Sequence, residues 1–198
     1  MQFGRFLARF FIGSLFFVHG TQKLFGWFGG PGLPGTTRMM ESLEMRPGRR
    51  HAIAAGATET AGGTMLALGA LTPLPAAALI GTMITAIRKV HLENGFFASN
   101  GGYEFNLTLI AGLVAIIDGG PGPVSVDRAL GIECTGGRWA LATFAAGAAG
   151  SAIAVAAGEH VAHQEAGPSR GGNQAASVSA ERGDGDREKR SVPSSTAP

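Results

Sequence analysis

Five apolar stretches follow one another along the first 158 residues, separated by short segments rich in Gly, Pro and charged residues. Several are near or below the roughly 20 residues that cross a bilayer, so a soluble bundle of buried helices is the alternative. The stretches lack the polar stripe of helical period that a soluble surface helix carries, which favours an all-α, polytopic membrane helical bundle. They cover residues 3–27, 51–71, 75–90, 103–118 and 139–158.

The last apolar stretch and the segment after it have different compositions. Residues 139–158 contain no charged residue and are rich in Ala and Gly, which permit close helix packing in lipid. This predicts an additional transmembrane helix over residues 138–158. Residues 159–198 are polar, mixed in charge and poor in large apolar side chains. Such a segment buries too little surface to offset its ordering entropy, so we expect a disordered polar tail.

Glu59 is the one formally charged residue between Arg50 and Arg88, within a run rich in Ala and Gly. Burying an isolated carboxylate costs several kcal/mol at least, so the group must be neutralised, paired or hydrated. An ionisable residue in such a setting is a functional-site candidate.

Polar side chains converge on one membrane face because successive spans run antiparallel. A rise of about 1.5 Å per residue puts His19 and Glu59 at a similar depth of roughly 12 to 14 Å, where they could pair. A structural alternative is that these groups only satisfy one another and fix helix register, while the long stem of Lys23 reaches the lipid headgroups. The predicted polar cleft contains His19, Lys23, Glu59, His91 and Glu104.

The chemistry of this cleft suits a quinone better than a metal. Glu59 can accept a proton, and His19 can polarise a quinone carbonyl. The chain has no HExxH or CxxC motif, and its closely spaced histidines, His160 and His163, lie in the predicted tail, so we predict no metal site. Cys134 is the single cysteine, which excludes an internal disulfide. The basic residues form no concentrated face, and we predict no nucleic-acid partner.

Five sequence blocks, taken in order, resemble the DoxX family of small integral membrane proteins. They are HGTQKLFGWFGGPG (19–32), TETAGGTMLALGALTPLPA (58–76), HLENGFF (91–97), GGYEFNL (101–107) and GGPGPVSVD (119–127). The resemblance implies a four-helix membrane domain over residues 1–130, to which the helix at 138–158 is added. It also marks Asp127 as a family-pattern turn residue, and it assigns no catalytic residue.

The resemblance implies a role in membrane redox chemistry. Members are similar to the small subunit of a thiosulfate:quinone oxidoreductase, and others are linked with oxidative-stress or thiol-related membrane complexes. We therefore expect an auxiliary or quinone-interacting subunit of a redox or oxidative-stress system, at most part of an oxidoreductase complex. Its expected partners are the lipid bilayer of a bacterial plasma membrane and other redox-complex subunits. The alternatives are a small-solute or proton transporter and a membrane scaffold for soluble oxidoreductases.

Overall fold

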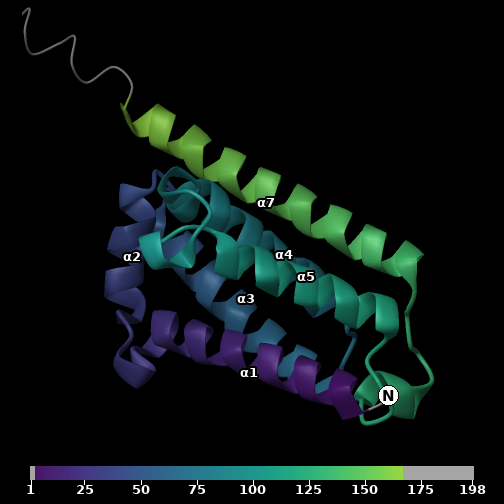
Figure 1. Cartoon of the computed structure of the whole chain (residues 1–198). Coiled ribbons are helices and arrows are strands. Elements are labelled where there is room, and N and C mark those ends of the chain that lie inside the picture. Colours follow the sequence, from purple (N-terminus) through teal and green to yellow (C-terminus); the bar gives the residue numbers. More distant parts are fainter. Residues whose placement is uncertain (1–2, 167–198) are drawn as a thin grey trace, which may run out of the picture. The chain divides into compact units, whose positions relative to one another are not determined.

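The computed structural model describes residues 3–166, and the regular structure in that range is entirely helical, as predicted. A π-helical turn, η2 (Ile87–His91), continues α4 without a break. The packing described below lies within residues 3–162, which belong to one compact unit. The main helices in Figure 1 are α1 (Phe3–Phe25), α2 (Gly32–Ser42), α3 (Gly48–Leu68), α4 (Pro73–Ala86), α5 (Glu104–Gly119), α6 (Val126–Leu130) and α7 (Gly137–Ala166).

Helices α1 and α3 pack antiparallel through pairs of glycines. Gly13 contacts the backbone of α3 at Gly63, and Gly20, two turns further on, contacts it at Gly56. A Cβ atom added to Gly63 would lie 2.5 Å from the carbonyl oxygen of Gly13 and 2.6 Å from the amide nitrogen of Phe17. Both obstacles are backbone atoms, so the two helices can approach this closely only because the side chains are absent.

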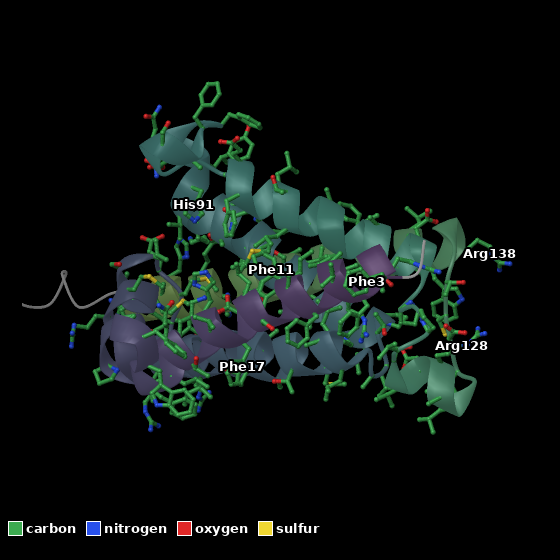
Figure 2. All side chains as sticks on the ribbon, turned by 60° about the horizontal axis from the view of Figure 1, so that its bottom comes forward. Phe3, Phe11, Phe17, His91, Arg128 and Arg138 are labelled. Atoms are coloured by element: carbon green, nitrogen blue, oxygen red, sulfur yellow. The ribbon has the colours of Figure 1, made fainter. Side chains whose placement is uncertain are left out.

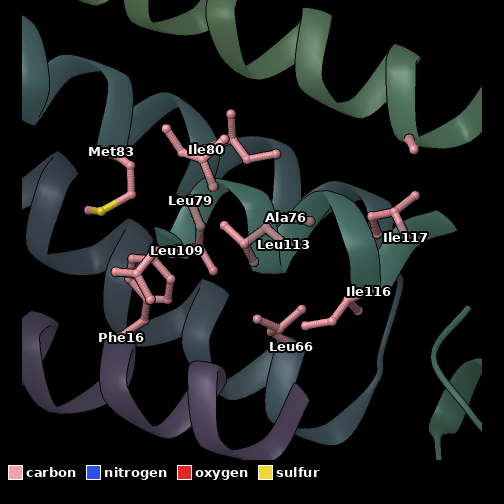
Figure 3. Packing of buried hydrophobic residues seen from close by; sticks show 12 residues of the cluster. Phe16, Leu66, Ala76, Leu79, Ile80, Met83, Leu109, Leu113, Ile116 and Ile117 are labelled. Atoms are coloured by element: carbon pink, nitrogen blue, oxygen red, sulfur yellow. The ribbon is translucent and has the colours of Figure 1, made fainter. Parts of the chain in front are cut away.

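The hydrophobic core lies between α1, α3, α4 and α5 (Figure 3). Leu79 on α4 and Leu113 on α5 are fully buried at its centre, and Phe16 reaches it from α1. The α7 helix contributes Ala140. The remaining members of the cluster are Leu66, Ala76, Ile80, Met83, Leu109, Ile110, Ile116 and Ile117.

Local sequence signals fix the sharp turn between α3 and α4. Gly69 ends α3 with a positive φ of 65°, and its amide donates to the carbonyl of Leu66, which is a glycine-based helix cap. Pro73 opens α4 at a position where a missing N–H costs nothing. The turn therefore reverses the chain within a few residues and makes α3 and α4 neighbours.

Two features of the fold differ from the sequence prediction. The segment between the first two apolar stretches was not predicted to be helical, but α2 begins at Gly32, because TTRMMES carries good helix formers behind the Gly and Pro residues. Helix α7 continues to Ala166, so residues 159–166 are helical rather than part of a disordered tail. No Pro or Gly interrupts these eight residues. The rest of the predicted tail, 167–198, lies outside the described residues.

Large apolar side chains are exposed along several helices, a pattern that is rare on the surface of a soluble monomer. Phe3 and Phe11 on α1 are 71% and 69% exposed, and both are labelled in Figure 2. Leu141 and Ile153 on α7 are each 70% exposed. By length and composition, α7 is the one helix within residues 3–166 that clearly meets the requirements for crossing a membrane.

The glycine contact between α1 and α3 can be tested with a single methyl group. We expect Gly63→Ala to lower the free energy of unfolding by about 1 to 3 kcal/mol, because the methyl overpacks a backbone contact. Gly150→Ala on α7 is the matched control, since its Cβ would meet no atom within 4 Å and should gain helix propensity. Unfolding in detergent measures both variants. Equal stability of the two would show that the contact is not tight.

Candidate functional site

A cavity of about 660 Å³ opens between the helices of the unit, and it collects most of the polar groups that the sequence pointed to. Its walls come from α1, α3, α4, α5 and α7, together with residues of α2 and of the segment between α4 and α5. A volume of this size is typical of small-molecule sites. Of the predicted cleft residues, those lining the cavity are His19, Lys23, Glu59 and His91.

The central polar feature of the cavity is an ion pair between Lys23 on α1 and Glu59 on α3. The ammonium of Lys23 donates hydrogen bonds to both carboxylate oxygens of Glu59. The Glu59 side chain is 1% exposed and that of Lys23 is 24% exposed, so the carboxylate forms the buried end of the pair. The charge that stood isolated in the sequence is therefore neutralised by a residue 36 positions earlier.

The predicted pair of Glu59 with His19 is wrong, although the predicted depth is consistent with the packing. Gly20 contacts α3 at Gly56 and Thr60, which puts Glu59 level with residues 19 and 20. Side chains on a helix point back toward its N-terminus, so the long stem of Lys23 brings its ammonium back by about one turn to that level. The shorter His19 ring stays exposed at the cavity wall. The same ion pair contradicts the alternative in which the Lys23 side chain extends to the lipid headgroups.

His91 lies at the end of the π-helical turn, and a backbone carbonyl defines which of its ring nitrogens carries the hydrogen. Its Nδ1 is 2.7 Å from the carbonyl oxygen of Gly101. Because a carbonyl oxygen only accepts, Nδ1 must carry the hydrogen, and Nε2 of the neutral ring is the acceptor. His91 thus offers a defined acceptor to the cavity that it lines.

Glu104 is not part of the cavity wall. Its Oε2 accepts a hydrogen bond from the amide of Ala98 at 3.0 Å, and its own amide donates to the carbonyl of Phe96 at 2.9 Å. The residue therefore shapes the loop between η2 and α5. The sequence placed Glu104 on the correct face, but it could not show that the loop would use the carboxylate.

Methionines are the lining residues that the sequence analysis missed. Four of the six methionines in the chain line the cavity, at Met39, Met40, Met45 and Met83. Met83 is also the acceptor for the buried amide of Asn106, at 3.4 Å. Flexible thioethers adapt to ligands of irregular shape. The cluster of Met39, Met40 and Met45 was visible in the sequence as the one methionine-rich segment.

Asp127 lies at the opposite end of the bundle and closes the turn between α3 and α4. It is buried, and its carboxylate accepts from the amides of Leu71 at 2.6 Å and Thr72 at 2.8 Å, and from the Thr72 hydroxyl. Leu71 has a φ of 48°, a conformation that side chains rarely adopt, so the carboxylate holds a strained residue in place. Asp127 is therefore a turn residue.

Buried Arg9 completes this second polar network. Its guanidinium donates to the carbonyls of Leu66 and Ala67 at the end of α3, and to the carbonyl of Val124 before α6. Figure 2 shows His91 at one end of the bundle and Arg128 and Arg138 at the other. Near the latter end, the hydrogen bond from exposed Arg128 to Glu133, at 2.7 Å, raises the pKa of Arg128.

The described residues offer no evident metal centre. Within residues 3–166, no group of three or more His, Cys, Asp or Glu side chains is placed to hold a metal ion. What the cavity offers instead is a buried ion pair, a histidine acceptor and apolar walls. These are the features of a site for an organic molecule with polar and apolar parts.

The fold and the cavity together define a helical membrane protein with a polar site between its helices. The DoxX family model matches residues 4–92, which supports membership of the DoxX family, a family of membrane proteins. The match contains α1 to α4 and the cavity residues His19, Lys23, Glu59 and His91. No curated protein and no solved structure matches the chain.

The ion pair predicts strongly coupled substitutions. Lys23→Met should destabilise the protein by about 3 to 5 kcal/mol, because it leaves the Glu59 carboxylate buried without a partner. Adding Glu59→Gln should restore much of that stability, since the remaining amide carries no charge. Unfolding of the two single variants and the double variant gives the coupling energy. Additive effects would contradict a buried pair.

The turn at Asp127 predicts a second, independent loss of stability. Asp127→Asn keeps the shape of the side chain but points an amide donor at backbone donors, so we expect a cost of about 1.5 to 3 kcal/mol. Glu133→Gln is the control, because its partner Arg128 is 63% exposed and exposed pairs contribute about 1 kcal/mol or less. Denaturant unfolding of the two variants compares them directly. A larger effect of Glu133→Gln would contradict the assignment.

Proposed function

We propose that this protein is a quinone-binding auxiliary subunit of a membrane redox or oxidative-stress system. The observation that carries the proposal is the cavity with the Lys23–Glu59 ion pair in its wall. Quinones combine a ring that presents carbonyl oxygens with a large apolar surface. A partly exposed ammonium beside a buried carboxylate, within apolar walls, complements both parts.

The lining residues suit the ring in both of its redox forms. The Lys23 ammonium can donate to a quinone carbonyl, and Glu59 or Nε2 of His91 can accept from a quinol hydroxyl. A bound quinone would supply the capacity to carry electrons and protons, while the protein positions the ring and accepts or donates the protons. His19 at the wall is a further donor or acceptor.

A polytopic membrane arrangement supports access of a quinone from the bilayer. We propose that α1, α3, α4 with η2, α5 and α7 all cross the membrane, since their exposed faces carry large apolar side chains. The continuous helix from Pro73 to His91 is about 28 Å long, close to the hydrocarbon thickness. Helix α5, with 16 residues, is about 24 Å long, a mismatch that local thinning accommodates at modest cost.

The cysteine content of the chain supports the auxiliary role. With Cys134 as its single cysteine, the chain cannot pass electrons through an internal thiol pair. We therefore propose that a partner subunit exchanges electrons with the quinone and that this protein holds the quinone in the plasma membrane. The basic residues at the cavity end favour a cytoplasmic position for that end.

Binding of a photoreactive quinone tests the proposal. In liposomes, a quinone carrying the reactive group on its ring should label cavity residues, and excess unlabelled quinone should suppress the labelling. With the probe reduced to its quinol form, Glu59→Gln should weaken binding by roughly tenfold or more, because the hydrogen bond from a quinol hydroxyl to the charged carboxylate is lost. Absence of saturable labelling would overturn the proposal. Equal binding by the variant would remove Glu59 from the site.

A stability control separates binding from folding. Asp127→Asn weakens the fold at the turn between α3 and α4 and changes no residue that lines the cavity. We expect this variant to bind the quinone as the unmodified protein does. If Asp127→Asn and Glu59→Gln lose binding to the same extent, the loss reflects folding and the role of Glu59 is rejected.

A further inference from the structure

We propose that the apolar half of the cavity is a groove for the prenyl tail of the quinone, with α7 as one of its walls. This inference rests on the proposed quinone site and extends it to the class of ligand, a long-tailed quinone. The groove involves α7, which lies outside the segment that matches the DoxX family model.

The length of the cavity exceeds what a quinone ring requires. One face of α4 lines it from Leu74 through Gly81 to Thr85, and Lys89 continues the line in the π-helical turn. The rise of about 1.5 Å per residue makes this path about 22 Å long. The pair lies partway along this path, because Gly62 contacts Leu79 and Glu59 lies one turn before Gly62 on the antiparallel α3. A ring held there leaves the stretch toward Leu74 free.

The charged and histidine side chains that line the cavity lie in the other half of the path. Lys23, Glu59, Lys89 and His91 belong to the part of the cavity formed by the end of α1 and the end of the α4 helix. The opposite end is formed by side chains without a polar atom, or by glycine, namely Leu74, Ala77, Ala78, Ala146 and Gly147. A ligand that matches this distribution has one polar head and one apolar chain.

The contact between α4 and α7 holds the groove at a fixed width. A Cβ atom on Gly147 would lie 2.7 Å from the carbonyl oxygen of Ala77, so the two backbones touch there. One turn further on, the hydroxyls of Thr85 and Ser151 are hydrogen-bonded at 2.8 Å and fix the register of the two helices. Gly150 lines the cavity beside this contact, yet a Cβ atom there would meet no atom within 4 Å. Space for a prenyl chain therefore remains next to the tight contact between α4 and α7.

The apolar end of the groove is open to the surroundings of the bundle. Leu74 lines the cavity and is 63% exposed, and Ala78 is exposed as well. In a membrane this opening would face lipid, so a tail longer than the groove can continue into the bilayer. Lipid is as apolar as the groove. We therefore expect the groove to direct the tail by its shape rather than to add much affinity.

Two photoreactive probes locate the ring and the tail separately. One quinone carries its reactive group on the ring and has no tail, and the other carries it at the far end of a prenyl tail. With the unmodified protein in liposomes, the first should label residues near Lys23 and Glu59. The second should label the segments around Leu74 to Ala78 and Ala146 to Gly147. Unlabelled long-tailed quinone should suppress both.

Blocking the groove should exclude the tail and leave the ring site intact. Gly150→Leu places a side chain in the open space, and we expect tail labelling to fall at least tenfold while the tail-less probe still binds. Ala149→Leu is the matched control, because Ala149 is exposed and does not line the cavity. Binding of the tail-less probe also verifies that each variant is folded.

Each alternative outcome has a distinct meaning. If neither probe labels the cavity, the proposed quinone function fails. If the ring probe labels the cavity but the tail probe labels lipid-facing residues such as Phe11, the tail groove alone is rejected. A tightly bound phospholipid in the groove that long-tailed quinone does not displace would also reject the tail groove. Equal tail labelling in Gly150→Leu and Ala149→Leu would reject it as well.

Discussion

The close contact between α1 and α3 is the constraint on which the rest of the structure depends. Gly13 and Gly20 meet Gly63 and Gly56, so the backbones themselves define how far each helix can slide along the other. In the proposed polytopic arrangement these helices lie in lipid, where water exclusion does not drive helices together and such contacts supply the packing energy directly. The same contact fixes the level of Glu59 relative to α1 and thereby brings it within reach of Lys23.

Sequence reasoning located the buried charge but not its partner. An isolated carboxylate in an apolar run is a strong signal, and the helical rise gives its level along the bundle relative to α1. Which neighbouring side chain reaches the carboxylate depends on the length and direction of that side chain. The number of residues along a helix gives neither quantity. Glu104 illustrates the same limit, because its carboxylate is taken up by the amide of Ala98 in a loop whose path the sequence does not define. Helix α2 was missed because the Gly and Pro residues before it dominated the local pattern.

Helix α7 shows why an Ala- and Gly-rich segment is easy to identify and hard to place. Its composition predicted a helix over 138–158, and the structure has one, but a helix of small side chains has no stripe that indicates which face packs. The packing face is set by single contacts that depend on the partner, such as Gly147 against Ala77 and Ser151 against Thr85. Both contacts lie on α4, so a helix outside the family match becomes a wall of the cavity that the matched segment begins.

The two buried polar networks differ in what surrounds their charges, and this difference separates structure from function. The side chains of Arg9 and Asp127 form hydrogen bonds with backbone groups of the α3–α4 turn and its neighbours. Backbone N–H and C=O groups need a hydrogen-bond partner wherever they are buried. Within the described part of the chain, the hydrogen bonds to the Glu59 carboxylate come from Lys23 alone, and neither residue satisfies a backbone group through its side chain. Replacing a buried pair of this kind with apolar residues is often neutral or stabilising, so folding alone gives little reason to retain it. A pair that lines a cavity and leaves its ammonium partly exposed has donors for a ligand to use, and this is why we place Lys23 and Glu59, rather than Arg9 and Asp127, at the centre of the proposed site.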